Sequence, residues 1–211
     1  MQLARASFAA LAAIMITFSP DHSAAVGMAV FSGFAIATGL VFLLSIWLVY
    51  PAGRRWPLVL MSIVTVLTGM VGGISLWRTV PVFFASVIVW ALLTGVVEFV
   101  AGLRARRALR AQDDPQRTSE ARDAIAVGAI TLLLGVAMLF VPTGYALNYY
   151  IEDAGQAFTL TGITIGVGLF GAYAAVVAVY LAIAAFSPRK PALVPGASVE
   201  GDTASDRGSA A

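Results

Sequence analysis

The sequence predicts an all-α, polytopic membrane protein with six transmembrane helices arranged as three tandem helical hairpins. Apolar residues make up 60% of the 211-residue chain and charged residues only 11%, and the mean hydropathy is +0.90. A soluble domain needs a more charged surface than this. The apolar residues also gather in blocks close to the roughly 20 helical residues that cross a bilayer. These blocks cover about residues 4–20, 24–50, 57–77, 81–103, 124–141 and 158–186.

Helices, rather than strands of a barrel, are the expected spanning elements. Charge interrupts the interior of the blocks only at Glu98, and no block alternates polar and apolar residues with a period of two. A helix satisfies its backbone amides within the span. We therefore expect a six-helix transmembrane domain over residues 1–186, a cytoplasmic loop over 104–123 and a disordered tail, rich in Pro, Gly, Ser and Ala, over 187–211.

The basic residues predict the orientation of the helices. Of the thirteen Lys and Arg residues, twelve lie near the N-terminus, between the second and third blocks, between the fourth and fifth blocks, or after the sixth. Arg78 is the exception. Because cytoplasmic loops carry the excess of positive charge, this bias predicts a multi-pass protein of the inner (plasma) membrane with both termini in the cytoplasm.

The first block has two interpretations that the sequence leaves open. Arg5 precedes a short apolar run and the small residues 23–25 follow it, which is the arrangement of a cleaved signal peptide. The Pro-Asp-His sequence at 20–22 instead favours a tight turn between two helices. Either interpretation leaves the other five helices in the same orientation.

Similar tetrapeptides recur in the second helix of each predicted pair. They are Thr-Gly-Leu-Val at 38–41, Thr-Gly-Val-Val at 94–97 and the looser Val-Gly-Leu-Phe at 167–170. In every pair the first helix is the shorter one. Three tandem helical hairpins are the simplest arrangement that gives this repetition.

The second hairpin carries the longest recognisable motif. Thr68-Gly69 and a turn to Pro81 are followed by Trp90-Ala-Leu-Leu-Thr94-Gly95-Val-Val-Glu98-Phe99 and Ala101-Gly102-Leu103-Arg104-Ala105-Arg106-Arg107. This pattern resembles the short repeat of the HdeD-like acid-resistance membrane proteins. The resemblance is good over residues 57–107, fair over 4–50 and poor over 124–186. It implies a six-helix inner-membrane protein linked to stress or acid survival, in a family without an established biochemical activity.

Glu98 is the one ionisable residue well inside a predicted span, and an intramembrane carboxylate is by default a functional candidate. It lies on a small-residue face suited to close helix packing. The expected role is packing and pairing, because Glu98 lies about 9 Å from Arg104 along the helix axis, close enough to the inner surface to snorkel or to pair with a basic side chain. The alternative is a proton-linked or gating role.

Asp21 and His22 are candidates for sensing external pH. They share the first outer turn, where a histidine with an ordinary pKa of about 6.5 would gain charge in acid. The favoured interpretation is a polar turn in which the aspartate caps a helix. One His without Cys or clustered carboxylates does not predict a metal site, and we expect no metal and no cofactor.

Two further groups of residues have expected structural roles. Small residues at four-residue spacing predict close helix packing. Arginines beside the membrane could bind anionic lipid headgroups, although setting the topology explains them equally well. The expected packing glycines are Gly39, Gly69, Gly73, Gly95, Gly162, Gly166 and Gly168. The expected headgroup contacts are Arg104, Arg106, Arg107 and Arg110.

The favoured function is a non-enzymatic membrane protein that supports acid or envelope stress tolerance. Its expected partners are the lipid bilayer and either a membrane protein or further copies of itself, with no nucleic acid. The outer segment 142–157 is the most plausible contact surface. The alternative is a small transporter or channel that uses Glu98, but the corresponding positions in the other pairs, Phe42 and Gly171, carry no carboxylate. An enzyme is not expected, because the sequence assembles no nucleophile and base.

Overall fold

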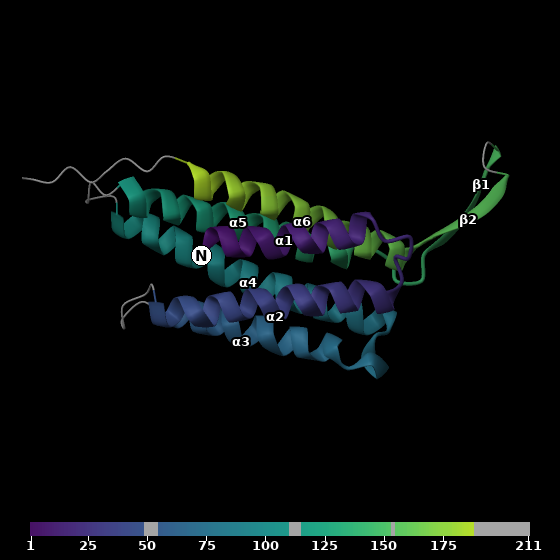
Figure 1. Cartoon of the computed structure of the whole chain (residues 1–211), viewed down its shortest axis with the longest axis horizontal. Helices are drawn as coiled ribbons and strands as arrows, with labels where there is room; N and C mark the ends of the chain where they lie inside the picture. Colours follow the sequence, from purple (N-terminus) through teal and green to yellow (C-terminus); the bar gives the residue numbers. More distant parts are fainter. Residues whose placement is uncertain (49–54, 110–114, 153–154, 188–211) are drawn as a thin grey trace, which may run out of the picture.

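The computed structural model describes residues 1–48, 55–109, 115–152 and 155–187. Its main elements are six helices that run side by side along the long axis of the molecule (Figure 1). Five of them are long and apolar enough to cross a membrane, while the first has 16 residues and is shorter than that. The helices are α1 (Gln2–Thr17), α2 (Ala24–Leu48), α3 (Trp56–Gly73), α4 (Val80–Ala108), α5 (Pro115–Leu139) and α6 (Gly162–Phe186).

The six helices form a closed circle in chain order, because each packs against the next and α6 returns to α1. The most extensive contacts join α2 to α3, α4 to α5, and α6 to α1. The packing therefore differs from the predicted tandem hairpins, in which α1 would pack most closely on α2, α3 on α4 and α5 on α6. Glycines explain the difference, since Gly39 and Gly69 bring α2 and α3 together and Gly95 and Gly128 do the same for α4 and α5.

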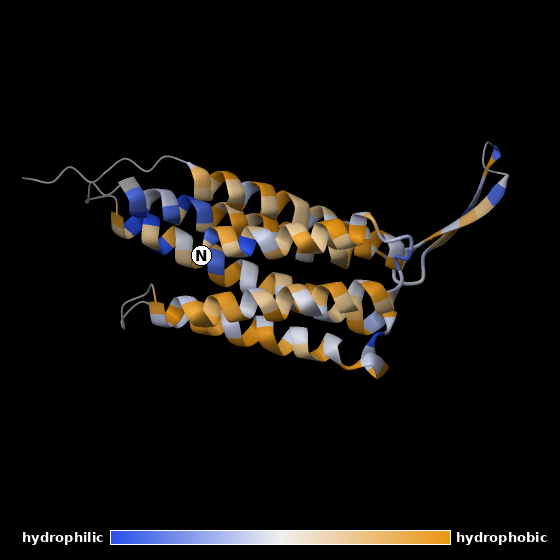
Figure 2. Ribbon diagram, viewed as in Figure 1, coloured by the Kyte–Doolittle hydropathy of each residue, from blue (hydrophilic) through white to orange (hydrophobic). Residues whose placement is uncertain are grey.

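The predicted loop 104–123 is largely helical. Helix α4 continues to Ala108 and α5 begins at Pro115, so only a short connection remains. Arg and Ala are strong helix formers, and Pro is favoured in the first turn of a helix. With 29 residues, α4 is about 44 Å long at 1.5 Å per residue, which exceeds the roughly 30 Å hydrocarbon core. The polar ends of α4 and α5 are coloured blue where they extend beyond α1 in Figure 2.

The outer segment also differs from the prediction, because it contains a β-hairpin. Strands β1 (Ala146–Ile151) and β2 (Gln156–Thr161) pair antiparallel, and the hairpin projects from one end of the bundle (Figure 1). Gly155 in the connection has a φ of 62°, which glycine adopts without steric cost. As a consequence α6 begins at Gly162 rather than at 158. The prediction failed here because aromatic and β-branched residues form a short apolar run that suits a strand as well as a helix.

Aromatic side chains from α2, α4 and α6 fill the centre of the bundle. Phe31 and Phe34 each meet Trp90 and Phe170 edge to face, with ring centroids 5.5 to 5.6 Å apart. Tyr173 continues the cluster at 5.8 Å from Trp90. Large apolar side chains also cover the outer faces of the helices, as the orange ribbons of Figure 2 show. An apolar interior beneath an apolar exterior is the distribution expected of an integral membrane protein.

Candidate functional site

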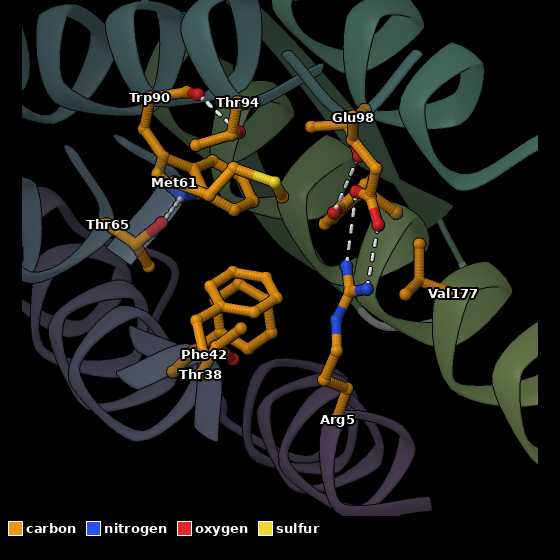
Figure 3. Close-up of a pocket in the computed structure, with 12 residues that line it drawn as sticks. Arg5, Thr38, Phe42, Met61, Thr65, Trp90, Thr94, Glu98 and Val177 are labelled. Carbon is orange, nitrogen blue, oxygen red and sulfur yellow. Dashed lines mark hydrogen bonds and ion pairs between the residues drawn. The ribbon is translucent and has the colours of Figure 1, made fainter. Parts of the chain in front are cut away.

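Glu98 on α4 forms a buried ion pair with Arg5 on α1. Arg5 Nη1 lies 2.7 Å from Glu98 Oε1, and Nη2 donates to Oε2 at 3.2 Å (Figure 3). The two side chains are 12% and 11% exposed. Because α1 and α4 are not neighbours in the circle of helices, the pair crosses the interior of the bundle. The partner is therefore Arg5 and not Arg104, which is exposed at the end of α4.

The geometry of this pair is that of a strong interaction. Two parallel N–H···O bonds join a planar guanidinium to a carboxylate, and such bidentate bonds are about twice as strong as neutral ones. The Arg5 guanidinium also lies 4.8 Å from the centroid of the Phe42 ring, which adds a cation–π contact. Removing one partner of a buried pair costs about 3–5 kcal/mol, since the other charge is left without compensation. Arg5 thus holds α1 against α2 and α4.

A small cavity lies beside the ion pair. It offers about 10 Å³ to the centre of a water-sized sphere. Its walls combine the charged pair with hydroxyl groups and with the aromatic cluster, so polar and apolar groups share the lining of the cavity. It is lined by Arg5, Phe34, Thr38, Phe42, Met61, Thr65, Trp90, Thr94, Glu98, Thr131, Tyr173 and Val177.

Most hydroxyl groups in the cavity wall are engaged in hydrogen bonds. Thr94 donates to the carbonyl of Trp90 at 2.6 Å, and Thr65 accepts from Trp90 Nε1 at 3.2 Å. Thr131 and Tyr173 share a hydrogen bond of 3.0 Å between α5 and α6. These bonds join α3 to α4 and α5 to α6 beside Glu98.

A second buried carboxylate, Asp123 on α5, was missed by the sequence analysis. It is 7% exposed and accepts hydrogen bonds from Gln2 Nε2 at 3.0 Å and from the Tyr180 hydroxyl at 3.1 Å. It was overlooked because residues 104–123 were assigned to a loop. A signal was present, since Asp123 begins a stripe of buried residues at spacings of three and four. The stripe continues through Val127, Thr131, Leu134 and Met138.

Asp21 and His22 lie in the turn between α1 and α2, about 18 Å or more from Arg5 along α1 at 1.5 Å per residue. The Asp21 carboxylate accepts from Ser23 N at 2.8 Å and from Ser23 Oγ at 2.9 Å. Asp21 therefore shapes the turn before α2, and His22 beside it is half-buried. The structure does not bring either residue close to Glu98.

Five of the seven predicted packing glycines lie in close contacts between segments. A Cβ added at Gly39 would lie 2.6 Å from Val66 Cγ2, and one at Gly95 would lie 2.9 Å from the backbone of Leu132. Gly69, Gly162 and Gly166 are similarly crowded.

The other two predicted packing glycines, Gly73 and Gly168, do not lie in close contacts between the described segments. A Cβ added at either position would meet nothing within 4 Å. Gly171 makes the close contact of α6 with α1, where an added Cβ would lie 2.7 Å from Ile16 Cγ2. Gly171, three residues after Gly168, therefore has the role in α6 that Gly39 has in α2 and Gly95 has in α4.

Three of the four predicted headgroup arginines lie at the C-terminal end of α4. Arg104, Arg106 and Arg107 are exposed, while Arg110 lies outside the described residues. Within the part of the chain that the structure describes, no group of three or more His, Asp or Glu side chains could hold a metal ion.

Comparison with known proteins adds no further information. No family model, no curated protein and no solved structure matches this chain. Its function is therefore inferred from the geometry of the bundle and from the sequence resemblance.

Proposed function

We propose that this chain is a non-enzymatic protein of the plasma membrane that supports acid or envelope stress tolerance through contacts with a membrane protein partner or with further copies of itself. The apolar helices support the membrane location. The HdeD-like pattern of residues 57–107 supports the link to acid stress. The bundle would serve as a stable scaffold, and its projecting parts would make the contacts.

One observation carries the scaffold role. The Arg5–Glu98 pair joins two helices that do not otherwise pack closely, and aromatic rings pack around the small cavity beside it. The side chains around the pair hold helices together, because they pack or form hydrogen bonds with residues of neighbouring helices. The β-hairpin supports the contact role, because β1 is exposed along its whole length and extends away from the bundle.

The orientation with both termini in the cytoplasm is part of the proposal. The last turns of α4, with their exposed arginines, and the start of α5, with Arg117, lie at the end of the bundle where α1 begins, while the connection from α3 to α4, which carries Arg78, lies at the opposite end. The positive-inside rule then places the hairpin outside the cytoplasm. A partner contacted through the hairpin would therefore be an envelope component.

Survival of a deletion strain in acid tests the proposal. We expect the strain to lose viability at low external pH and to regain it with the wild-type gene. Equal survival of the deletion strain and its parent would remove the acid-tolerance role. Purification in mild detergent should also recover a stoichiometric membrane protein partner or a defined homo-oligomer.

A small proton-linked transporter is the second candidate. It is favoured by the polar cavity that lies beside an intramembrane carboxylate. Proton flux in reconstituted vesicles distinguishes it from a scaffold. Flux that the wild type supports and Glu98→Gln abolishes, at unchanged folded yield, would establish the transporter.

A further inference from the structure

The cavity beside Arg5 and Glu98 has polar groups in its wall, and the charges among them are balanced. The guanidinium and the carboxylate pair with each other, so together they present no net charge. Among the residues that the structure describes, no other charged side chain lines the cavity. An ion placed there would gain little from the pair and would lose its hydration, so the cavity suits a neutral, polar occupant.

Thr38 on α2 supplies a hydroxyl group that needs such an occupant. The residue is 4% exposed, lines the cavity and has no hydrogen-bond partner for Oγ1 among the described residues. It differs from Thr94, Thr65 and Thr131, whose hydroxyl groups are all bonded. Buried polar groups in proteins are satisfied by protein or by ordered water, and few are left without either.

Acceptor positions face the same cavity. Thr131 donates its hydroxyl hydrogen to the carbonyl of Val127 at 2.8 Å, so the Tyr173 hydroxyl must donate in their shared bond. The Tyr173 oxygen then keeps its lone pairs as acceptors. The Glu98 carboxylate has about four acceptor positions, and the two bonds from Arg5 occupy two of them.

We propose that this cavity is a binding site for one water molecule, held by Thr38, Glu98 and Tyr173. Its volume of about 10 Å³ is close to the lower limit for one water, and a buried water usually has two to four polar partners. The water accepts from the Thr38 hydroxyl and donates to the Glu98 carboxylate and the Tyr173 oxygen. Thr38, Arg5 and Glu98 are labelled in Figure 3 among the side chains that line this cavity.

A water at this site extends the hydrogen bonding of the ion pair to two more helices. Arg5 and Glu98 directly join α1 to α4, and the water adds α2 through Thr38 and α6 through Tyr173. Four helices then share one hydrogen-bonded network. The inference concerns the interior of the bundle and is independent of any role in acid tolerance.

Whether Thr38→Val raises or lowers the stability of the protein tests the water site. An unpaired buried hydroxyl is unfavourable, so replacing it with a methyl group stabilises a protein, whereas removing a hydroxyl that binds water destabilises it. We expect Thr38→Val to lower the Tm in mild detergent by about 2–4 °C, and Thr38→Ser to stay near the wild type. Thr68→Val is the matched control, because Thr68 bonds only to carbonyls of its own helix, at 2.8 and 3.1 Å.

If Val packs badly at position 38, the Tm falls whether or not a water is bound. A spectroscopic measurement therefore detects the water independently of stability. Infrared difference spectra between H₂¹⁶O and H₂¹⁸O should show a sharp, isotope-sensitive O–H stretch in the wild type and in Thr68→Val, but not in Thr38→Val. A Tm that is unchanged or raised in Thr38→Val would overturn the proposal. So would the absence of the isotope-sensitive band from the wild type.

Discussion

Arg5 and Glu98 are 93 positions apart in the sequence, yet the guanidinium of one donates to the carboxylate of the other at 2.7 Å. The contact joins the first helix of the chain to the fourth, across the interior of the bundle. It gives α1, the shortest of the six helices, a specific attachment. Alanines and Ile16 along α1 complete that attachment by packing against the rest of the bundle.

Asp123 should contribute to stability at the end of the bundle where α1 begins. Asp123→Ala removes the acceptor of the bonds from the half-buried Gln2 and Tyr180, and a typical hydrogen bond contributes about 0.5–1.5 kcal/mol. We expect a loss of this size in the free energy of unfolding. Glu120→Ala, at an exposed position on the same helix, is the control and should change it by less than about 0.5 kcal/mol. Equal effects of the two variants would argue against the buried position of Asp123.

Two glycines of the repeat should respond differently to the same substitution. Gly95→Ala places a Cβ 2.9 Å from the backbone nitrogen of Leu132, so α4 and α5 must separate. We expect a loss of about 1–3 kcal/mol, the usual range for overpacking. Gly168→Ala meets nothing within 4 Å and should be neutral or stabilise α6 by up to about 1 kcal/mol through helix propensity. Thermal unfolding of both variants in the same detergent measures the difference.

The predictions succeeded where composition decides the structure and failed where contacts between distant residues decide it. Apolar blocks of membrane length located all six helices, because bilayer thickness fixes the length of a spanning segment. The number of spans is still a prediction, since α1 is shorter than the other five helices.

The failures have three physical causes. Helix α5 begins at Pro115, ahead of its apolar block, because charged residues also form helices. The strands at 146–161 were not recognised, because short apolar runs suit a strand or a helix. The partner of Glu98 depends on how six helices close into a circle, and spacing along one helix does not show which basic side chain that partner is.

Membrane topology can be tested with a reporter that is active only outside the cytoplasm. Fusions after Arg110 or Lys190 should be silent, and insertions after Arg78 or Gly155 should be active, because basic segments are retained in the cytoplasm. The Gly155 insertion also reports on the side of the membrane that carries the β-hairpin. Activity at Lys190 would contradict the six-span arrangement with both termini in the cytoplasm.

His22 can be tested as a pH sensor once a deletion strain shows an acid phenotype. We expect His22→Gln to restore survival fully, because the hydrogen bonds that shape this turn come from Asp21 and Ser23. Asp21→Ala is the companion variant, and it should lower stability by about 1 kcal/mol through loss of the bonds before α2. Failure of His22→Gln at low pH, with normal survival at neutral pH, would instead assign the sensing role to His22.

A double-mutant cycle on Arg5 and Glu98 tests most directly whether this ion pair holds the bundle together. Arg5→Met and Glu98→Gln should each lower the free energy of unfolding by about 3–5 kcal/mol, because each leaves a buried charge without its counter-charge. Arg104→Met, at an exposed position, is the control and should have little effect. We expect the double variant to lose clearly less than the sum of the single losses, with a coupling of about 1–3 kcal/mol. Additive effects, or single losses as small as that of the control, would show that Arg5 and Glu98 do not form a stabilising pair in the folded protein.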